Sequence, residues 1–456
     1  MRARSVTLLL SAGLAAFSAG CGVLWKPDLS RTTPIASLRK PPRPLIFIHG
    51  FLGSKLRNPE TRSIAWGRMT NVLFGGDNDS LKLALDGEWS AGEDLEAYQI
   101  YDELWGVDYY REILRSLRTA GGYRIGDIDD PKPGDNAFVF VYDWRRDNVE
   151  SARLLAEAID RLEAALGDPD LRFDLLTHSQ GGLIARYYVK YGGVDVLDRE
   201  TPAIPTMAGA EHVNKVIMLG TPNRGCLQAL KILHVGVKKV FRPMRPEVVF
   251  TMPSIYQMLP HRGQAVFVDE AGNSLDLDIY DAETWARQGW SAFSKEAQKR
   301  ARRRMDLSAH GLAEHDRRLS SFLDRSLRRA DAFHRALDAP AAGEGRIAYH
   351  AFGGDCKSTP KTAIVTRRRG EPVILFEEDR GRDEMAPDHL AEVLYGPGDG
   401  TVLMQSLLDI GEGEPGTDDP VVDFDSVFFV CENHGVLANN PIFQNNLLYL
   451  LLREEN

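Results

Sequence analysis

A short apolar segment, a serine and an amphipathic helix follow one another directly near the middle of the chain. Residues 171–176 have the composition of a buried β-strand, and residues 182–191 have the apolar spacing of a helix. Ser179 stands between them and is followed by two glycines. This arrangement is typical of the sharp turn that exposes a nucleophilic serine in hydrolases. The same serine can also simply cap the helix by accepting its first free N–H groups.

Segments of β character alternate with helical segments on both sides of this serine. Strands are expected at residues 44–48, 137–142, 171–176 and 215–219, and the helices between them at 108–120, 151–166 and 182–191. Strands and helices that alternate at this spacing form βαβ units, which build a parallel sheet. The strands are nearly continuous apolar runs, as expected where helices cover both faces of a sheet. The pattern predicts an α/β fold with a mostly parallel sheet flanked by helices.

The alternation stops after the fourth strand. Residues 226–345 have mainly helical spacing, and strand character returns only at 346–352 and 426–430. The predicted organisation is an α/β core formed by residues 44–225 and 346–456, with the helical segment inserted as a cap before the last two strands. An insertion at this point can cover the carboxyl ends of the strands, where open α/β sheets bind ligands.

The first twenty residues differ from the rest of the chain. Residues 1–4 contain two arginines, and residues 8–19 are apolar and small, which is typical of a secretory signal peptide and too short to span a membrane. Cys21 follows small residues and resembles the lipidated cysteine of bacterial lipoproteins. We therefore expect a signal peptide at 1–20, a linker at 21–43, and export to the cell envelope or secretion. An ordinary cleaved signal, with Cys21 unmodified, is the alternative.

Composition limits the classes of function and of site. The chain has 456 residues, 43% of them hydrophobic, and a formal net charge of −10, which gives no support for nucleic-acid binding. The sequence does not show how the remaining three cysteines, Cys226, Cys356 and Cys431, would pair. It contains no Cys-x-x-Cys, His-x-x-x-His or calcium-loop spacing, so we predict no metal site and no cofactor.

A nucleophilic serine needs a base within hydrogen-bond reach and a third group that orients the base. In the α/β-hydrolase arrangement these residues follow one another as serine, acid and histidine. The chain offers this order in Ser179, Asp399 and His434. Asp355 is a second candidate for the acid, because it directly follows a predicted strand. Asp399 could instead form an Asp-Gly turn, and His434 could be a surface or helix-capping residue.

Acyl transfer also needs N–H donors that face the developing oxyanion. The N–H of the residue after the serine, Gln180, is one candidate, and the loop after the first strand supplies Phe51 as the other. His178 adjoins the serine, but neighbouring side chains on a tight turn diverge, so it is a poor candidate for the base. In the segment Tyr142–Arg145, the aspartate and the arginine are best explained as an ion pair with a structural role.

Five short segments follow one another in a fixed order: PLIFIHGFLGSKL at 44–56, VYDWRR at 141–146, THSQGG at 177–182, GDGTV at 398–402 and NH at 433–434. In order and spacing they resemble the motifs of the lecithin:cholesterol acyltransferase family, which includes lysosomal phospholipase A2 and phospholipid:diacylglycerol acyltransferases. The resemblance covers roughly residues 42–452. It implies an α/β-hydrolase fold with a cap.

The resemblance also implies roles for individual residues. Ser179 would be the nucleophile, His434 the base and Asp399, preferred over Asp355 on this ground, the residue that orients the base. The N–H groups of Phe51 and Gln180 would form the oxyanion hole. Two positions depart from the usual patterns: Gln180 is polar where the family has an aliphatic residue, and a threonine precedes His178 where G-x-S-x-G has its first glycine.

The expected activity is O-acyl transfer or phospholipase-type cleavage on glycerophospholipids through an acyl-enzyme, with an alcohol or water as acceptor. Two alternatives remain: a general esterase or lipase that uses only water, and a non-catalytic lipid-binding envelope lipoprotein. The basic segment at 295–304 suggests association with a membrane surface. The sequence does not rank transferase over hydrolase, because that depends on how the acceptor pocket excludes water.

Overall fold

The computed structural model describes residues 43–67, 78–85, 95–101, 103–104, 107–168, 170–198, 203–237, 243–305, 309–341, 347–376, 388–411 and 422–453. The predicted signal peptide, Cys21 and nearly all of the predicted linker lie outside these residues. None of the helices within the described ranges combines the length and the apolar character needed to cross a membrane.

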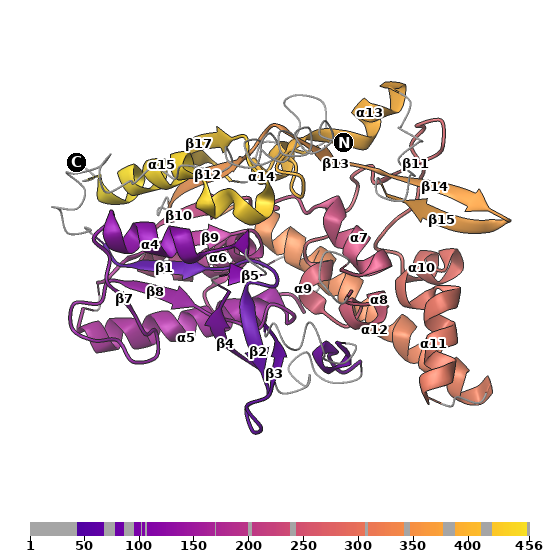
Figure 1. The fold of residues 1–456 in the computed structure, drawn as a ribbon, viewed down its shortest axis with the longest axis horizontal. Coiled ribbons are helices and arrows are strands. Elements are labelled where there is room, and N and C mark those ends of the chain that lie inside the picture. Colours follow the sequence, from indigo (N-terminus) through magenta and orange to yellow (C-terminus); the bar gives the residue numbers. More distant parts are fainter. Residues whose placement is uncertain are drawn as a thin grey trace, which may run out of the picture.

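A seven-stranded sheet lies at the centre of the described part of the chain, in the order β17-β12-β10-β9-β1-β8-β7 (Figure 1). All its neighbouring strands pair in parallel. The strands are β1 (Leu45–Ile48), β7 (Ile125–Gly126), β8 (Ala137–Phe140), β9 (Phe173–His178), β10 (Val213–Leu219), β12 (Ala348–Gly354) and β17 (Phe424–Val430). The flanking helices are α4 (Arg111–Thr119), α5 (Asn148–Leu166), α6 (Gln180–Tyr191) and α15 (Pro441–Leu452).

Different helices cover the two faces of the sheet (Figure 1). Leu45 and Phe47 of β1 belong to the core cluster that includes α4 and α15, whereas Ile46 and Ile48 belong to the cluster that includes α5 and α6. Successive side chains of a strand point to opposite faces, and all four of these side chains are buried. This two-sided cover explains why the strands read as continuous apolar runs.

Local sequence fixes the ends of the flanking helices. Asp147 caps α5 by accepting a hydrogen bond from the N–H of Val149 at 2.8 Å. Gly167 ends the same helix at φ 71°, a left-handed conformation that glycine adopts without steric cost. At α15, Asn440 accepts hydrogen bonds from two N–H groups of the first turn, and a proline follows it. The signals at α5 agree with the helix predicted at residues 151–166.

The insertion between β10 and β12 lies beside the sheet and is mainly helical (Figure 1). It contains α7 (Leu227–Val235), α8 (Pro246–Val249), α9 (Pro253–Tyr256), α10 (Ala282–Gln288), α11 (Lys295–Met305) and α12 (Ala309–Asp338). A parallel sheet flanked by helices, with this insertion before its last two strands, confirms the predicted fold class.

Short strands outside the central sheet were not expected from the sequence. In the cap, β11 (Phe267–Val268) pairs with β14 (Ala363–Arg368), which in turn pairs with β15 (Glu371–Leu375). The cap therefore includes a pairing with a segment that lies beyond β12. Elsewhere β2 (Ser54–Arg57), β3 (Ile64–Trp66) and β4 (Glu96–Ile100) form an antiparallel sheet, and β13 (Lys357–Pro360) pairs with β16 (Tyr395–Gly398).

Candidate active site

Ser179 forms a sharp turn between β9 and α6. Its backbone has φ 54° and ψ −122°, a conformation that residues with a Cβ rarely adopt. Its side chain makes no capping hydrogen bond to the helix. Its N–H donates to the carbonyl of Leu219 at 2.8 Å, which ties the turn to the end of β10. The structure therefore favours the strained elbow over the helix-capping alternative.

Glycines around the turn permit a close approach of three backbone segments. A Cβ on Gly182 would lie 2.0 Å from Oγ1 of Thr221, and one on Gly181 would lie 2.6 Å from the carbonyl oxygen of Ile48. A Cβ on Gly50 would lie 2.9 Å from Cβ of Ser179. Real Cβ atoms essentially never come so close. The glycines are thus required to bring the loop after β1 against the serine.

Thr177 replaces the first glycine of the G-x-S-x-G pattern without disturbing the elbow. Its side chain is fully buried, and its hydroxyl donates to the carbonyl of Ile217 in β10 at 3.1 Å. The hydroxyl is therefore satisfied within the sheet, as a buried polar group must be.

His434 connects Ser179 to Asp399. It begins the 3₁₀ helix η6 (His434–Asn439) just after β17, and its Nε2 lies 3.0 Å from Oγ of Ser179. Its Nδ1 lies 2.7 Å from Oδ2 of Asp399. A carboxylate only accepts hydrogen bonds, so Nδ1 carries the proton and Nε2 is left to accept one from the serine hydroxyl. The three side chains form one directed hydrogen-bond chain.

Asp399 follows β16 and is 2% exposed. Its Oδ1 accepts hydrogen bonds from the N–H groups of Thr401 and Val402 at 2.9 and 2.7 Å, which forms the Asp-Gly turn considered as the alternative role of this residue. Its Oδ2 remains for His434. The turn and the pairing with histidine therefore coexist in one carboxylate. Asp355, the other candidate, has an exposed side chain.

Hydrogen bonds and a ring contact hold the loop after β1 beside the serine. The N–H of Gly50 donates to the hydroxyl of Tyr110 at 3.1 Å. His49 is buried, its Nδ1 donates to the carbonyl of Gly50 at 2.8 Å, and its ring stacks on Tyr142. Burial lowers the pKa of His49 to about 4, so the ring is neutral. Neither the N–H of Phe51 nor that of Gln180 donates a hydrogen bond within the described part of the chain.

The polar side chain of Gln180 points into the protein. It is fully buried, and its Nε2 donates to Oδ1 of Asn148 at 2.8 Å. The N–H of Asn148 in turn donates to Oε1 of Gln257, which follows α9 in the cap. Where the family has an aliphatic side chain, the amide of Gln180 thus forms buried hydrogen bonds that connect the elbow to α5 and, through Asn148, to the cap.

The ion pair of Asp143 with Arg145 has the structural role expected for it. Arg145 is fully buried, and Asp143 accepts hydrogen bonds from its Nε and Nη2 at 2.9 and 2.6 Å. Its Nη1 donates to the carbonyl of Leu81. Such multiple partners are what a buried charge requires. No group of three or more metal-binding side chains is found among the residues that the structure describes.

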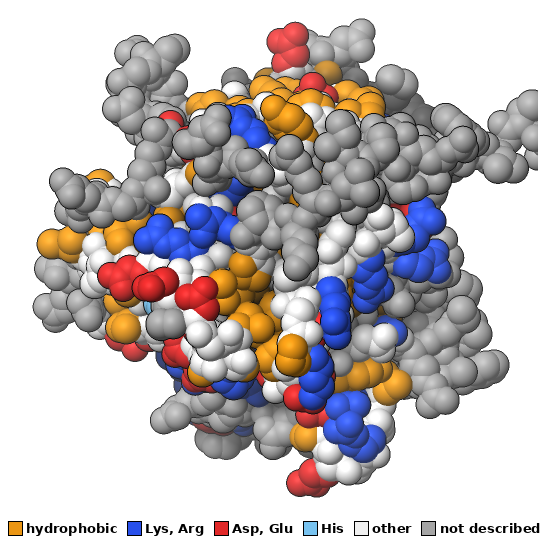
Figure 2. Space-filling model, turned by 90° about the vertical axis from the view of Figure 1, so that its left-hand side faces the viewer, with side chains coloured by type: hydrophobic (Ala, Val, Ile, Leu, Met, Phe, Trp, Pro, Cys, Tyr) orange, Lys and Arg blue, Asp and Glu red, His pale blue; other side chains and the backbone are white. Residues whose placement is uncertain are grey.

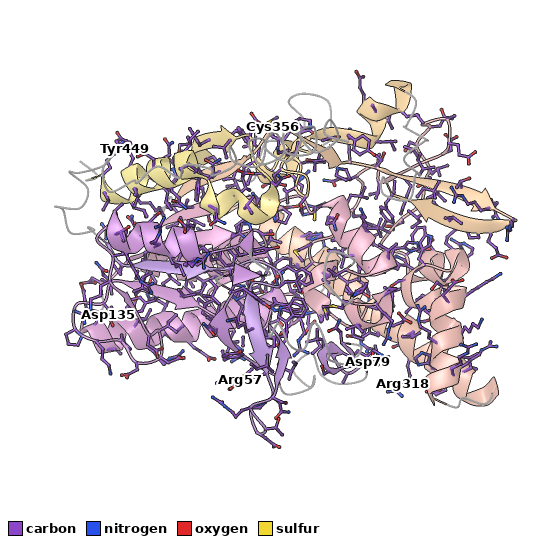
Figure 3. The ribbon with its side chains drawn as sticks, in the orientation of Figure 1. Arg57, Asp79, Asp135, Arg318, Cys356 and Tyr449 are labelled. Atoms are coloured by element: carbon purple, nitrogen blue, oxygen red, sulfur yellow. A yellow bond between two sulfur atoms is a disulfide. The ribbon has the colours of Figure 1, made fainter. Side chains whose placement is uncertain are left out.

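Two features of the site were not predicted. A disulfide joins Cys356 to Cys431, which is three residues before His434, while Cys226 is free. Cys356 lies at the side of the molecule that carries β17 and α14 (Met404–Leu407) (Figures 1 and 3). His178, dismissed as a base, contacts Tyr110 and the main chain of His434.

Part of the chain is similar to a known protein family. Residues 106–301 match the family described as lecithin:cholesterol acyltransferase. The match spans less than half of the chain and shows a similarity to this family. This match and the α/β-hydrolase fold together support an enzyme that acts on the ester bonds of lipids. No sequence among curated proteins matches the chain.

Several solved structures are similar to the chain at low sequence identity. The crystal structure of the Tle4-Tli4 complex is 16% identical, with a TM-score of 0.55 over 91% of this chain and 98% of that chain. Lipase 1 from Pelosinus fermentans is 13% identical, with a TM-score of 0.35 over 91% and 100%. The mature lipase BlEst2 from Bacillus licheniformis is 11% identical, with a TM-score of 0.35 over 91% and 93%. At such identities the first likeness shows the fold alone.

Proposed function

We propose that the protein is a serine O-acyltransferase or phospholipase that acts on acyl esters of glycerophospholipids through an acyl-enzyme. The observation that carries the proposal is the hydrogen-bond chain from Ser179 through His434 to Asp399 on a strained elbow. The family match to residues 106–301 supports a lipid ester as the substrate.

The first half-reaction transfers the acyl group to the enzyme. Oγ of Ser179 attacks the ester carbonyl carbon while its proton passes to Nε2 of His434. Asp399 stabilises the imidazolium that forms. The N–H groups of Phe51 and Gln180 donate hydrogen bonds to the developing oxyanion. When the tetrahedral intermediate collapses, the lysophospholipid oxygen leaves with the proton from His434.

The second half-reaction releases the acyl group. An alcohol or water gives its proton to Nε2 of His434 and attacks the acyl carbon. Oγ of Ser179 then leaves and takes the proton back. The two outcomes, transfer and hydrolysis, use the same groups and differ only in the acceptor that is held in line with the acyl carbon.

The test uses the purified protein with a labelled phospholipid, with and without a sterol or a diacylglycerol. We expect acyl release or transfer in the parent and none in Ser179→Ala, and product analysis by mass spectrometry identifies the acceptor. Free fatty acid alone, with no acylated alcohol, would favour the esterase or lipase alternative. Equal activity of Ser179→Ala would refute the proposal. Failure of a fluorophosphonate probe to label the folded parent would instead favour a non-catalytic lipid-binding protein.

We further propose export and attachment through lipidated Cys21. The basis is the sequence of residues 1–21 alone. Metabolic labelling with a fatty acid should mark the parent protein and not Cys21→Ser. Labelling of both, or of neither, would contradict the lipid anchor.

The proposed contact with a membrane surface rests on α11. Its Lys299, Arg302 and Arg303 are exposed basic side chains on one short helix. The side of the molecule drawn in Figure 2 instead exposes acidic, basic and hydrophobic side chains intermixed. Sedimentation with vesicles that contain anionic phospholipid should be reduced when these three residues are changed to glutamine, and unchanged binding would exclude α11 as the contact.

A further inference from the structure

Two buried side chains connect the two parts of the candidate site that lie on either side of Ser179. The hydroxyl of Tyr110 lies 2.7 Å from Nδ1 of His178 and accepts a hydrogen bond from the N–H of Gly50 at 3.1 Å. On the other side of the ring, Nε2 of His178 lies 3.2 Å from the carbonyl oxygen of His434. One chain of contacts therefore runs from the loop after β1 to the loop that carries the histidine.

The position of each proton in this chain follows from the partners. The carbonyl of His434 can only accept, so Nε2 of His178 carries the proton and donates it. Nδ1 is then the acceptor and takes the hydroxyl proton of Tyr110. The hydroxyl oxygen of Tyr110 is left to accept from the N–H of Gly50. All three hydrogen bonds run in one direction, and no alternative arrangement satisfies the backbone groups at both ends.

Burial keeps both groups in these states. Tyr110 is 2% exposed and His178 is 5% exposed. Burial lowers the pKa of His178 to about 3, with a smaller contribution from His434, and burial raises the pKa of Tyr110. The imidazole is therefore neutral at neutral pH. His178 neither competes with His434 for the serine proton nor adds a second positive charge beside it.

We propose that Tyr110 and His178 are positioning residues that hold the loop after β1 and the main chain of His434 at a fixed separation around Ser179. The inference rests on the proposed function, since it concerns the placement of the oxyanion donor Phe51 and of the base. Gly50 immediately precedes Phe51, so a shift of Gly50 moves the donor. A shift of the His434 main chain moves its ring away from the serine.

The central experiment is Tyr110→Phe in the full-length protein. The change removes one hydroxyl and leaves the N–H of Gly50 and Nδ1 of His178 without this partner. We expect kcat to fall about 10- to 100-fold, because small misplacements of reacting groups have such effects, while KM changes by less than about two-fold. The initial rate of fluorophosphonate labelling should fall in the same proportion. Labelling taken to completion gives the folded, reactive fraction and corrects for any loss of folding.

Tyr123→Phe is the matched control. Tyr123 is 3% exposed and belongs to the same core cluster as Tyr110, but its hydroxyl has no hydrogen-bond partner among the described residues. We expect this variant to keep the parental kcat. Equal kcat in Tyr110→Phe, Tyr123→Phe and the parent would overturn the proposal, as would equal losses in both variants.

A double-mutant cycle tests whether the two residues act as one unit. His178→Phe keeps a ring but removes both the acceptor for Tyr110 and the donor toward His434. If both belong to one chain, the double variant should lose no more kcat than the worse single variant. Losses that multiply would overturn the coupling. Ser179→Ala separates this inference from the proposed function: if it is inactive while Tyr110→Phe is fully active, only the inference fails.

Discussion

Nε2 of His434 lies 3.0 Å from Oγ of Ser179, although the two residues are 255 positions apart in the chain. The contact depends on two separate loops, one after β9 and one after β17, which meet at the carboxyl ends of the parallel strands. Asp399 fixes the orientation of the ring through Nδ1. His434 therefore already has its proton on Nδ1 and a free lone pair on Nε2, as a base for the serine hydroxyl requires.

The first prediction concerns the acid. In Asp399→Asn the carboxylate that receives the Nδ1 proton of His434 is lost, and the imidazole can adopt the wrong tautomer. We expect kcat to fall by about 10³- to 10⁴-fold with little change in KM. Steady-state kinetics on a chromogenic acyl ester measures both.

Asp355→Asn is the control for this change. Asp355 follows β12 and is exposed, so we expect its kcat to stay close to the parental value. Comparable losses of kcat in both variants would show that Asp399 is not the acid that orients His434.

The second prediction concerns the glycine at the start of α6. A Cβ on Gly181 would lie 2.6 Å from the carbonyl oxygen of Ile48 and 2.7 Å from that of His49. Both atoms belong to the backbone at the end of β1, which cannot move without disturbing the sheet. We expect Gly181→Ala to lower the free energy of unfolding by at least about 1–3 kcal/mol, measured by urea denaturation.

Gly193→Ala provides the comparison. The nearest atom to a Cβ there is Cβ of Ala156 at 3.3 Å, and a small shift relieves this contact. This variant should be nearly as stable as the parent, and a loss as large as that of Gly181→Ala would argue against close backbone packing as the cause.

Sequence patterns predicted the central sheet and its flanking helices because both depend on local information. Short and mostly apolar segments mark the buried strands β1, β8, β9 and β10, and the apolar stripe on α5 has helical spacing. Asp399 was preferred over Asp355 on the family resemblance alone, but Ser179 and His434 each follow a predicted strand. In a parallel sheet such positions meet at one edge, so their proximity was predictable.

Pairings between distant short segments were not predictable. The two residues of β11 carry too little pattern to reveal a partner nearly a hundred positions away in β14. The pairing of Cys356 with Cys431 depends on how β12 and β17 lie in space, which three cysteines do not encode. The link through His178 was missed because its contacts involve a tyrosine hydroxyl and a backbone carbonyl, and neither leaves a signal in the sequence.

The third prediction concerns the disulfide. Cys356 and Cys431 are 75 positions apart in the chain. Cys356 directly precedes β13, which pairs with β16 just before Asp399, and Cys431 is three residues before His434. The bond therefore fastens the two loops that carry the partners of Ser179. Its loss should lower the free energy of unfolding by about 2–5 kcal/mol and lower kcat.

Cys431→Ser and mild reduction of the parent should have the same effects on the denaturation midpoint and on kcat. Reduction should have no further effect on Cys431→Ser. Cys226 is free, so Cys226→Ala should respond to reduction as the parent does. A parent protein that keeps its midpoint and kcat after complete reduction would contradict this role.

The last prediction concerns acid stability. Burial lowers the pKa of His49 to about 4 and of His178 to about 3, and holds the pKa of His334 well below its ordinary value. In the unfolded chain these histidines titrate near 6.5. Between that pH and their folded pKa values the unfolded state binds more protons than the folded state, so stability rises with pH and is lost as pH falls.

We therefore expect the free energy of unfolding to be highest above about pH 6.5 and to fall by about 1.4 kcal/mol per pH unit for each of these histidines below it. Urea denaturation at pH 7, 6 and 5 measures the slope in a range where most carboxyl groups stay ionised. His49→Gln removes one titrating group from this set and should reduce the slope by close to one proton. If the free energy of unfolding of the parent does not change between pH 7 and 5, these imidazoles are not held neutral in the folded state. The folded and unfolded chains would then bind the same number of protons in this range.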